Sequence, residues 1–306
     1  MDFILETNNL TKIYGQKEAV RDVNLHIQEG TIYGLIGRNG AGKTTIMRII
    51  SGLSTPSRGS YSLFGKTGYA MGRELKHVGV LIEHPGLYPR LSAYENLKIK
   101  CMAMGIRPQG YVESLLELVG LENTDRKKAS GAYSLGMRQR LGIALALVGD
   151  PKIIILDEPI NGLDPQGIVE VRKTLTLLRD EKGITIMASS HILDELSRVA
   201  DHYGIINEGT LLDEFSADEL HKRSGQYVNI RTRDNAGAEA ALKGIGIQRI
   251  DRETDGTLRV SERMDDTAAM VSAIVNAGVQ LEEIYVRTIS LEEYYLGVTG
   301  GGKHNG

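Results

Sequence analysis

The stretch TIYGLIGRNGAGKTTIMRIISG, from Thr31 to Gly52, decides the fold of this chain. It begins with a β-branched and apolar run, passes through a glycine-rich turn and ends in a segment whose apolar residues recur at helical spacing. The turn, GRNGAGKT, fits the pattern G-x-x-x-x-G-K-[ST], which forms a phosphate-binding loop between a strand and a helix. Such a pattern also arises by chance in glycine-rich loops, but the flanking strand and helix favour nucleotide binding.

The residue types of this loop supply the chemistry of anion binding. Its glycines adopt conformations closed to residues with a Cβ, so that successive N–H groups converge on one anion at the positive end of the following helix. Lys43 is expected to reach the β- and γ-phosphates, and the Thr44 hydroxyl to hold Mg²⁺. The predicted nucleotide-binding residues of the loop are Gly37, Arg38, Asn39, Gly40, Ala41, Gly42, Lys43, Thr44 and Thr45.

Charge and composition exclude several classes of protein. The chain has 306 residues, enough for about two domains. Its net charge is −3 and it has no long basic tract, which disfavours nucleic-acid binding. The single Cys101 cannot form an internal disulfide and has no Cys/His cluster beside it, which excludes a structural zinc site. The N-terminus lacks an apolar core of signal-peptide length, and no uninterrupted apolar run is long enough to predict a membrane span.

Strand patterns lie on both sides of the loop. FILETNNLTKIYG and VNLHI alternate apolar and polar residues, which predicts two half-buried strands joined around GQKEA (residues 15–19). Tyr14, which closes the first strand, either stacks on an adenine ring or packs against its neighbours. After the loop, Val78–Ile82 has the pattern of a buried strand and ends at Glu83.

Residues 86–150 are predicted to form a helical insert between strands. Ser92 and Glu95 form a capping box that opens one helix, and Met137–Val148 has the pattern of an apolar helix. The turn Ser134-Leu135-Gly136 precedes this helix. It is either a second anion-binding cradle or an ordinary helix start, since many helices begin with such residues.

Candidate catalytic residues follow two strands downstream. The apolar strand Lys152–Leu156 ends in Asp157 and Glu158. At a strand end beside the phosphates, Asp157 is expected to hold Mg²⁺ through water, and Glu158 to orient or deprotonate the attacking water. Without the upstream loop, such a pair is usually a solvated turn. His191 follows the strand ITIMASS at the same edge, where it either bridges the γ-phosphate and water or is structural.

The character of the sequence changes near Gln226. From there the pattern spells β-α-β-β-α-β with no catalytic constellation, which predicts a small α+β accessory domain. The predicted division is an ATP-binding domain over residues 1–222 and an accessory domain over residues 226–306.

The ordered set GRNGAGKT, YSLGM, IIILDEP, NGLD and SSH resembles the ATP-binding subunit of ABC transporters, over roughly residues 1–220. The resemblance implies the α/β fold of a P-loop NTPase of ABC type, with a mixed-sheet core, an antiparallel β subdomain and the helical insert. It implies ATP and Mg²⁺ as cofactors. It also implies a homodimer, or a paired ATPase subunit, on the cytoplasmic inner face of the membrane beside an integral-membrane permease.

By this resemblance, Tyr14 stacks on adenine, Asp157 is the Mg²⁺-associated acid, Glu158 is the base and His191 is the switch histidine. Ser134 and Gly136 match the signature turn, which in this family contacts the γ-phosphate bound to the other subunit. Asp164 matches the aspartate that couples the two sites. Neither anion cradle is then a complete site within one chain.

Two departures from the family pattern refine this interpretation. Glu83 stands where the family usually has a Gln that touches Mg²⁺ or water, and YSLGM replaces the common LSGGQ. Both departures resemble bacitracin and lantibiotic self-protection exporters, so the predicted function is ATP hydrolysis that powers export of a peptide antibiotic. The alternatives are a non-transport ABC ATPase acting on the ribosome or DNA, and a regulatory subunit that never turns over. Such ribosome or DNA proteins generally have paired ATPase units, a long coiled coil or a basic surface.

Overall fold

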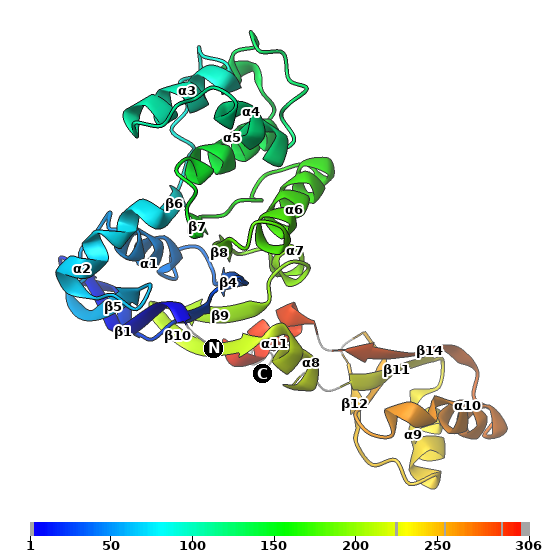
Figure 1. Cartoon of the computed structure of the whole chain (residues 1–306). Helices are drawn as coiled ribbons and strands as arrows, with labels where there is room; N and C mark the ends of the chain where they lie inside the picture. Colours follow the sequence, from blue (N-terminus) through cyan, green and yellow to red (C-terminus); the bar gives the residue numbers. More distant parts are fainter. Residues whose placement is uncertain (1–2, 224–225, 254, 289, 301–306) are drawn as a thin grey trace. The chain divides into compact units, whose positions relative to one another are not determined.

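The computed structural model describes the chain except for residues 1–2, 224–225, 254, 289 and 301–306. The described residues form two compact units, the first extending to Ala217 and the second running from Asp218 to Gly297. The sequence pattern places the boundary slightly later, between residues 222 and 226. Each unit has its own buried core and is described by itself (Figure 1).

A six-stranded sheet lies at the centre of the first unit. Its strands are β4 (Ile32–Ile36), β6 (Val78–Leu81), β7 (Ile153–Leu156), β8 (Thr185–Ser190), β9 (His202–Asn207) and β10 (Thr210–Ser216). They lie in the order β10-β9-β4-β8-β7-β6. All neighbours pair in parallel except β9 and β10, which form an antiparallel hairpin. The expected mixed sheet is thus confirmed.

A second, antiparallel sheet completes the β structure of this unit. It contains β1 (Phe3–Tyr14), β2 (Lys17–Val23), β3 (His26–Gln28) and β5 (Arg58–Leu63). The expectation of a loop over GQKEA is wrong, because Tyr14 already pairs with Lys17. A two-residue turn suffices because Gly15 adopts a positive φ of 60°, which is open to glycine.

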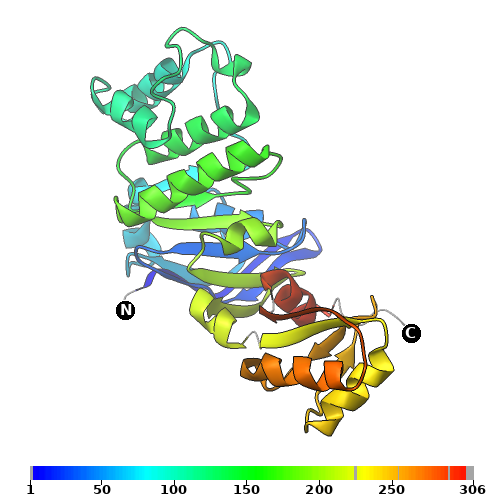
Figure 2. The same cartoon turned by 90° about the vertical axis from the view of Figure 1, so that its right-hand side faces the viewer.

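The first unit contains seven α-helices within its described residues. They are α1 (Lys43–Ile50), α2 (Gly68–Gly72), α3 (Ala93–Ala103), α4 (Tyr111–Leu118), α5 (Leu135–Leu147), α6 (Pro165–Asp180) and α7 (Leu193–Ser197), with short 3₁₀ turns at Glu74–His77 and Ser130–Ala132. Helices α3, α4 and α5 lie between β6 and β7 in the chain and form the helical insert. Figure 2 shows the insert stacked at one end of this unit, where α5 packs against α6 and against β6 and β7 of the sheet.

Side-chain caps set the starts of these helices. The capping box of α3 is present, with the Ser92 hydroxyl accepting from the Glu95 amide and the Glu95 carboxylate accepting from the Ser92 amide. Helix α5 begins two residues before the expected start because the Ser134 hydroxyl caps it, accepting from the Met137 amide at 3.2 Å. The cap fixes the turn in place at a helix N-terminus.

Three neighbouring strands carry the centre of the core. Every residue of β4, β7 and β8 is buried, as expected for parallel strands that are covered on both faces. The residues that follow each strand emerge at one edge of the sheet, because parallel strands end at the same edge. This edge holds the glycine-rich loop, Asp157 and His191.

The second unit is a four-stranded antiparallel sheet with helices. Its elements are α8 (Ala217–Arg223), β11 (Gln226–Thr232), α9 (Asn235–Gly244), β12 (Ile250–Arg252), β13 (Leu258–Val260), α10 (Thr267–Asn276), β14 (Leu281–Thr288) and α11 (Leu291–Val298), with a 3₁₀ turn at Met264–Asp266. The strand order is β12-β13-β11-β14. Val228 and Ile230 of β11 pack against Met270 and Ile274 of α10. The expected β-α-β-β-α-β pattern is confirmed.

Candidate nucleotide-binding site

The glycine-rich loop turns tightly between β4 and α1. Gly42 has a φ of 110°, and a Cβ there would lie 2.7 Å from the Ala19 carbonyl oxygen. At Gly37 a Cβ would lie 2.4 Å from the Ile206 carbonyl oxygen. Both positions therefore require glycine, and the loop can bring its amides close to an anion at the N-terminus of α1.

A cavity of about 340 Å³ opens over this loop. Its lining combines backbone of the loop with basic, hydroxyl, aromatic and acidic side chains. The lining residues are Tyr14, Lys17, Ala19, Arg38, Asn39, Gly40, Gly42, Lys43, Thr44, Thr45 and Glu158. A larger cavity, of about 700 Å³, lies between α4 and the C-terminal end of α6, away from the loop. Size alone therefore does not mark the nucleotide site.

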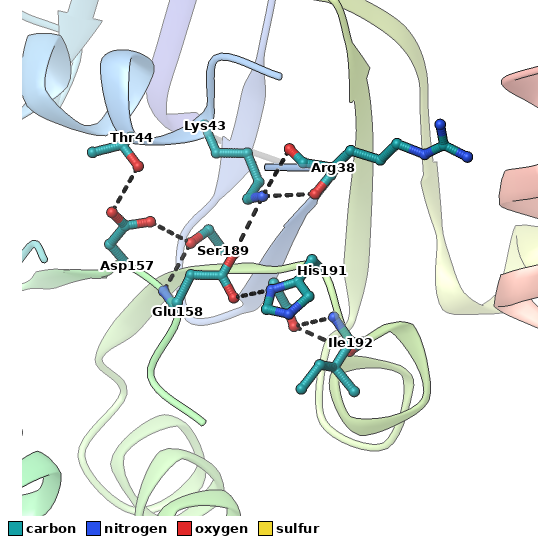
Figure 3. Close-up of polar contacts among 10 residues, drawn as sticks. Arg38, Lys43, Thr44, Asp157, Glu158, Ser189, His191 and Ile192 are labelled. Atoms are coloured by element: carbon teal, nitrogen blue, oxygen red, sulfur yellow. Dashed lines mark hydrogen bonds and ion pairs between the residues drawn. The ribbon is translucent and has the colours of Figure 1, made fainter. Parts of the chain in front are cut away.

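Lys43 is the central cation of the site. Its side chain is only 5% exposed, and its ammonium donates to the carbonyl oxygens of Gly37 at 2.6 Å and Arg38 at 3.3 Å (Figure 3). The same ammonium lies 3.2 Å from Oε1 of Glu158. The carbonyls and the carboxylate hold the buried charge at the centre of the loop.

Asp157 joins the loop to the neighbouring strand. Its Oδ2 accepts from the Thr44 hydroxyl at 2.8 Å, and its Oδ1 accepts from the Ser189 hydroxyl at 2.6 Å (Figure 3). A hydroxyl and a carboxylate at this distance are hard oxygen donors of the kind that Mg²⁺ prefers. The residues present therefore fit a magnesium ion between Thr44 and Asp157.

Glu158 is held by contacts to three neighbours. Its amide donates to the Ser189 hydroxyl at 2.9 Å, and its Oε2 lies 2.7 Å from Nδ1 of His191 (Figure 3). A carboxylate can only accept, so Nδ1 of His191 is the donor in this contact. Oε1 lies beside Lys43 but makes no hydrogen bond. One carboxylate oxygen is thus fixed while the other is available for chemistry.

Tyr14 and Glu83 take different places relative to the cavity. Tyr14 lines it, with a side chain that is 47% exposed and a ring 5.0 Å from the Lys12 ammonium. Glu83 does not line it. Its carboxylate accepts from Arg48 at 2.5 Å, one helical turn beyond Thr44 on α1. The metal role of Glu83 stays a prediction.

The signature turn also lies outside the cavity lining. Ser134 and Leu135 are exposed at the start of α5, while Gly136 is buried with Gly167 of α6 beside it. Asp164 caps α6 and accepts from the Gly167 amide at 3.0 Å. The predicted roles of Ser134, Gly136 and Asp164 toward a second subunit stay predictions.

Sequence reasoning missed two residues of this site. Ser189 hydrogen-bonds both Asp157 and the Glu158 amide, and Lys17 lines the cavity. The signal for Ser189 was its position, because it lies next to the last residue of β8, beside the strand that Asp157 follows. Lys17 gave no signal, since the turn before it was expected to be longer.

A glycine-rich loop, a buried lysine, and a hydroxyl and carboxylate pair together define a P-loop nucleotide-binding protein. The family model described as ABC transporter matches residues 20–161. The chain is 40% identical to the bacitracin transport ATP-binding protein BcrA of Bacillus licheniformis, with 99% of each covered, and 42% identical to BcrA of Enterococcus faecalis, with 99% of this chain and 98% of that one covered. The chain belongs to the ATP-binding proteins of ABC transporters, a family that binds and hydrolyses ATP.

A lantibiotic relative and the solved structures cover less of the chain. The lantibiotic transport ATP-binding protein SrtF of Streptococcus pyogenes is 45% identical over 70% of this chain and 92% of its own length. Among solved structures, cbiO1 of Clostridium perfringens covers 72% of this chain and 91% of its own, with a TM-score of 0.66 at 28% identity. A bacterial ABC transporter cassette solved as a dimer covers 70% and 98%, with a TM-score of 0.63 at 25% identity. No helix among the described residues is long and apolar enough to cross a membrane.

Proposed function

We propose that this chain is the ATP-hydrolysing subunit of a transporter that exports a peptide antibiotic through a separate permease, from the cytoplasmic face of the membrane. The observation that carries the proposal is end-to-end identity of 40% and 42% with two bacitracin transport ATP-binding proteins. That similarity spans both units, whereas the lantibiotic transport relative aligns over 215 residues. The end-to-end match favours bacitracin-like cargo over other peptides.

In this proposal, ATP binding redirects Lys43. Its ammonium now donates to two carbonyls of the loop and contacts Glu158. The β- and γ-phosphate oxygens are stronger acceptors than neutral carbonyls, so Lys43 exchanges these partners for phosphate. Thr44 and Asp157 would hold Mg²⁺, which supplies neutralisation of the phosphate charge. Tyr14 provides a face for the adenine ring.

Hydrolysis then uses Glu158 as general base. With Lys43 drawn to the phosphates, Oε1 loses its ion-pair partner and accepts the proton of the attacking water. His191 donates to Oε2 and therefore fixes the direction of the carboxylate. Ser189 holds the same segment through the Glu158 amide. His191 and Ser189 are positioning residues in this scheme, and Glu158 is the catalytic one.

The proposal includes two copies of the chain. The exposed N-terminus of α5, with Ser134 at its start, offers amides to the γ-phosphate held by the facing copy. The cassette solved as a dimer supports pairing in this family. Closure on ATP and reopening after hydrolysis would drive the permease.

Drug susceptibility tests the proposal. The chain is co-expressed with the permease from its neighbouring reading frame in a sensitive bacterium, and growth is measured against bacitracin and a lantibiotic. We expect protection against bacitracin that disappears when Glu158→Gln replaces the natural chain. Unchanged susceptibility to both peptides, with the purified chain still hydrolysing ATP, would reject the cargo while leaving the ATPase intact.

A further inference from the structure

The sheet of the second unit has β14 as an edge strand, paired on one side only. In the order β12-β13-β11-β14, β14 pairs with β11 on one side and with no other described strand. An edge strand presents a row of backbone N–H and C=O groups that another chain can use. Within its own unit, the free side of β14 therefore lacks a hydrogen-bonding neighbour.

The side chains of β14 are open as well. On β11, the strand beside it, four of the seven residues are buried. On β14, by contrast, Tyr285 and Val286 are 44% and 43% exposed, and Glu283 and Arg287 are exposed too. The exposed aromatic ring and branched apolar side chain, next to unpaired backbone groups, offer a partner strand apolar surface to cover.

The register separates the two faces of β14. Ile284 packs into the core beneath the helices, so Glu283, Tyr285 and Arg287 lie on the opposite face. There, Glu283 lies 2.9 Å from Arg231 of β11, and Arg287 lies 3.5 Å from Glu293 of α11. The face therefore carries two ion pairs with Tyr285 between them.

We propose that β14 pairs antiparallel with β14 of a second copy of this chain, about a two-fold axis at Tyr285, and that this contact forms without nucleotide. In this register Glu283 lies opposite the partner's Arg287, and Arg287 opposite the partner's Glu283. On the other face, Ile284 lies opposite the partner's Val286. Charge and apolar character thus match at each of these positions.

Other antiparallel registers lack this match. In an antiparallel pair, two opposed residues lie on the same face of the sheet. The two-fold axis therefore always passes through a residue, and each alternative register moves it to the next residue along the strand. An axis at Glu283 or at Arg287 places like charges together, and an axis at Ile284 or Val286 places a charged residue opposite Tyr285. The charges of Glu283 and Arg287 therefore disfavour the other registers and favour the one with its axis at Tyr285. Charged side chains on edge strands commonly limit pairing in this way.

The ion pairs already present extend across this contact. Arg231, Glu283, the partner's Arg287 and the partner's Glu293 would follow one another with alternating sign, and the axis repeats the row. The existing pairs are shared with the partner, so none has to be broken. A standing dimer would keep two ATPase units at high effective concentration between cycles of ATP binding. This role goes beyond the proposed function and does not depend on the cargo.

Charge reversal tests the pairing in the full-length chain, without nucleotide and with EDTA, by sedimentation velocity. We expect a dimer for the natural chain, and for Glu283→Arg and Arg287→Glu alone a dissociation constant raised about tenfold or more, because both cross-strand pairs become repulsive. Mixing the two variants should restore dimers, since every opposed pair is then unlike. Arg252→Glu, on the other edge strand β12, is the matched control and should dimerise normally. A monomeric natural chain, single variants that dimerise normally, or a mixture that stays monomeric would each overturn the proposal.

A cysteine at the axis gives a second readout. Cys101 is buried and is replaced by Ser, after which Tyr285→Cys should form a disulfide between two copies under mild oxidation without nucleotide. Val275→Cys on α10, also exposed, serves as the control and should stay unlinked. Equal linking of both cysteines, or of neither, would contradict a contact centred on Tyr285.

Discussion

Two helices of this protein begin at turns suited to an anion, and they differ in what surrounds them. Helix α1 follows the glycine-rich loop and begins with the buried Lys43, which has Glu158 beside it. Helix α5 follows Ser134, which is exposed and uses its hydroxyl to cap its own helix. Both helix ends carry a similar partial positive charge. Only the first has a full set of charged side chains around it.

This difference indicates which steps of ATP binding and hydrolysis each turn can support. The α1 turn has a cation for phosphate, oxygen ligands for a metal and a carboxylate for water, all from one chain. The α5 turn offers backbone amides and a hydroxyl at a surface. A ligand bound there must be held mainly by something else, which agrees with a site completed between two copies. The following changes test this division, from the largest expected effect to the smallest.

Replacing Glu158 with Gln should have the largest effect. The amide keeps the shape and can still face His191, but it cannot take a proton, so ATP hydrolysis should fall by about 10²- to 10⁴-fold. ATP binding should change little, and ATP-bound dimers should live longer. Phosphate release and nucleotide titration measure the two effects. Glu181→Gln, at an exposed residue after α6, is the control. Undiminished turnover in the Glu158 variant would show that Glu158 is not the general base.

Replacing Lys43 with Ala should act on binding. It removes the ammonium that would contact two phosphates, and hydrogen bonds to charged groups contribute about 1.5–3 kcal/mol each. We expect ATP affinity to fall by about 100-fold or more, measured by calorimetry. Lys152→Ala, a lysine outside this cavity, should bind ATP normally. Unchanged affinity in the Lys43 variant would contradict the assignment of the loop.

Replacing Ser134 with Asp addresses the second turn. Asp caps helices as well as Ser, so α5 should persist, but a negative charge now meets the phosphate brought by the facing copy. Affinity of a single chain for ATP should stay the same, while hydrolysis should fall about tenfold through weaker pairing. Ser134→Asn, a neutral cap, is the matched control. If the Ser134→Asp variant lost ATP affinity as strongly as the Lys43 variant, the two turns would belong to one site within one chain.

Some parts of the site around α1 could be predicted from the sequence, and others could not. The glycine loop is a local pattern whose conformation follows from neighbouring residues, so its position and its lysine could be read directly. The contact of Ser189 with Asp157 joins residues 32 positions apart. It follows from the register of β7 with β8, where Leu156 lies beside Ala188, and that register is set by tertiary packing. The turn before Lys17 was misjudged because the polar residues Lys17 and Glu18 were taken for a loop, although they form the exposed start of β2.

The contact between Glu83 and Arg48 could not be predicted from the sequence, because it too depends on tertiary packing. The residue was expected near the metal because the family that the sequence resembles usually has a Gln there that touches Mg²⁺ or water. In the structure its carboxylate contacts Arg48, on the helix that follows the loop, and its metal role stays a prediction. Whether a carboxylate turns toward a metal or toward a nearby guanidinium depends on competing charges in space, and the sequence spacing of 35 residues does not encode it.

Replacing Glu83 with Gln should therefore have the smallest effect. Both partners of the Arg48 pair are about half exposed, and such pairs contribute about 1 kcal/mol or less, so stability to urea should change by no more than that. Turnover should stay within about threefold, because the amide oxygen can still accept a hydrogen bond where a carboxylate would. Glu18→Gln, which removes the comparably exposed pair with Arg58, is the stability control. A loss of hydrolysis as deep as that of the Glu158 variant would show that the negative charge itself acts on the metal or the water. Glu83 would then belong with the side chains around α1, and the first turn would draw on a third carboxylate that leaves Arg48 when ATP arrives.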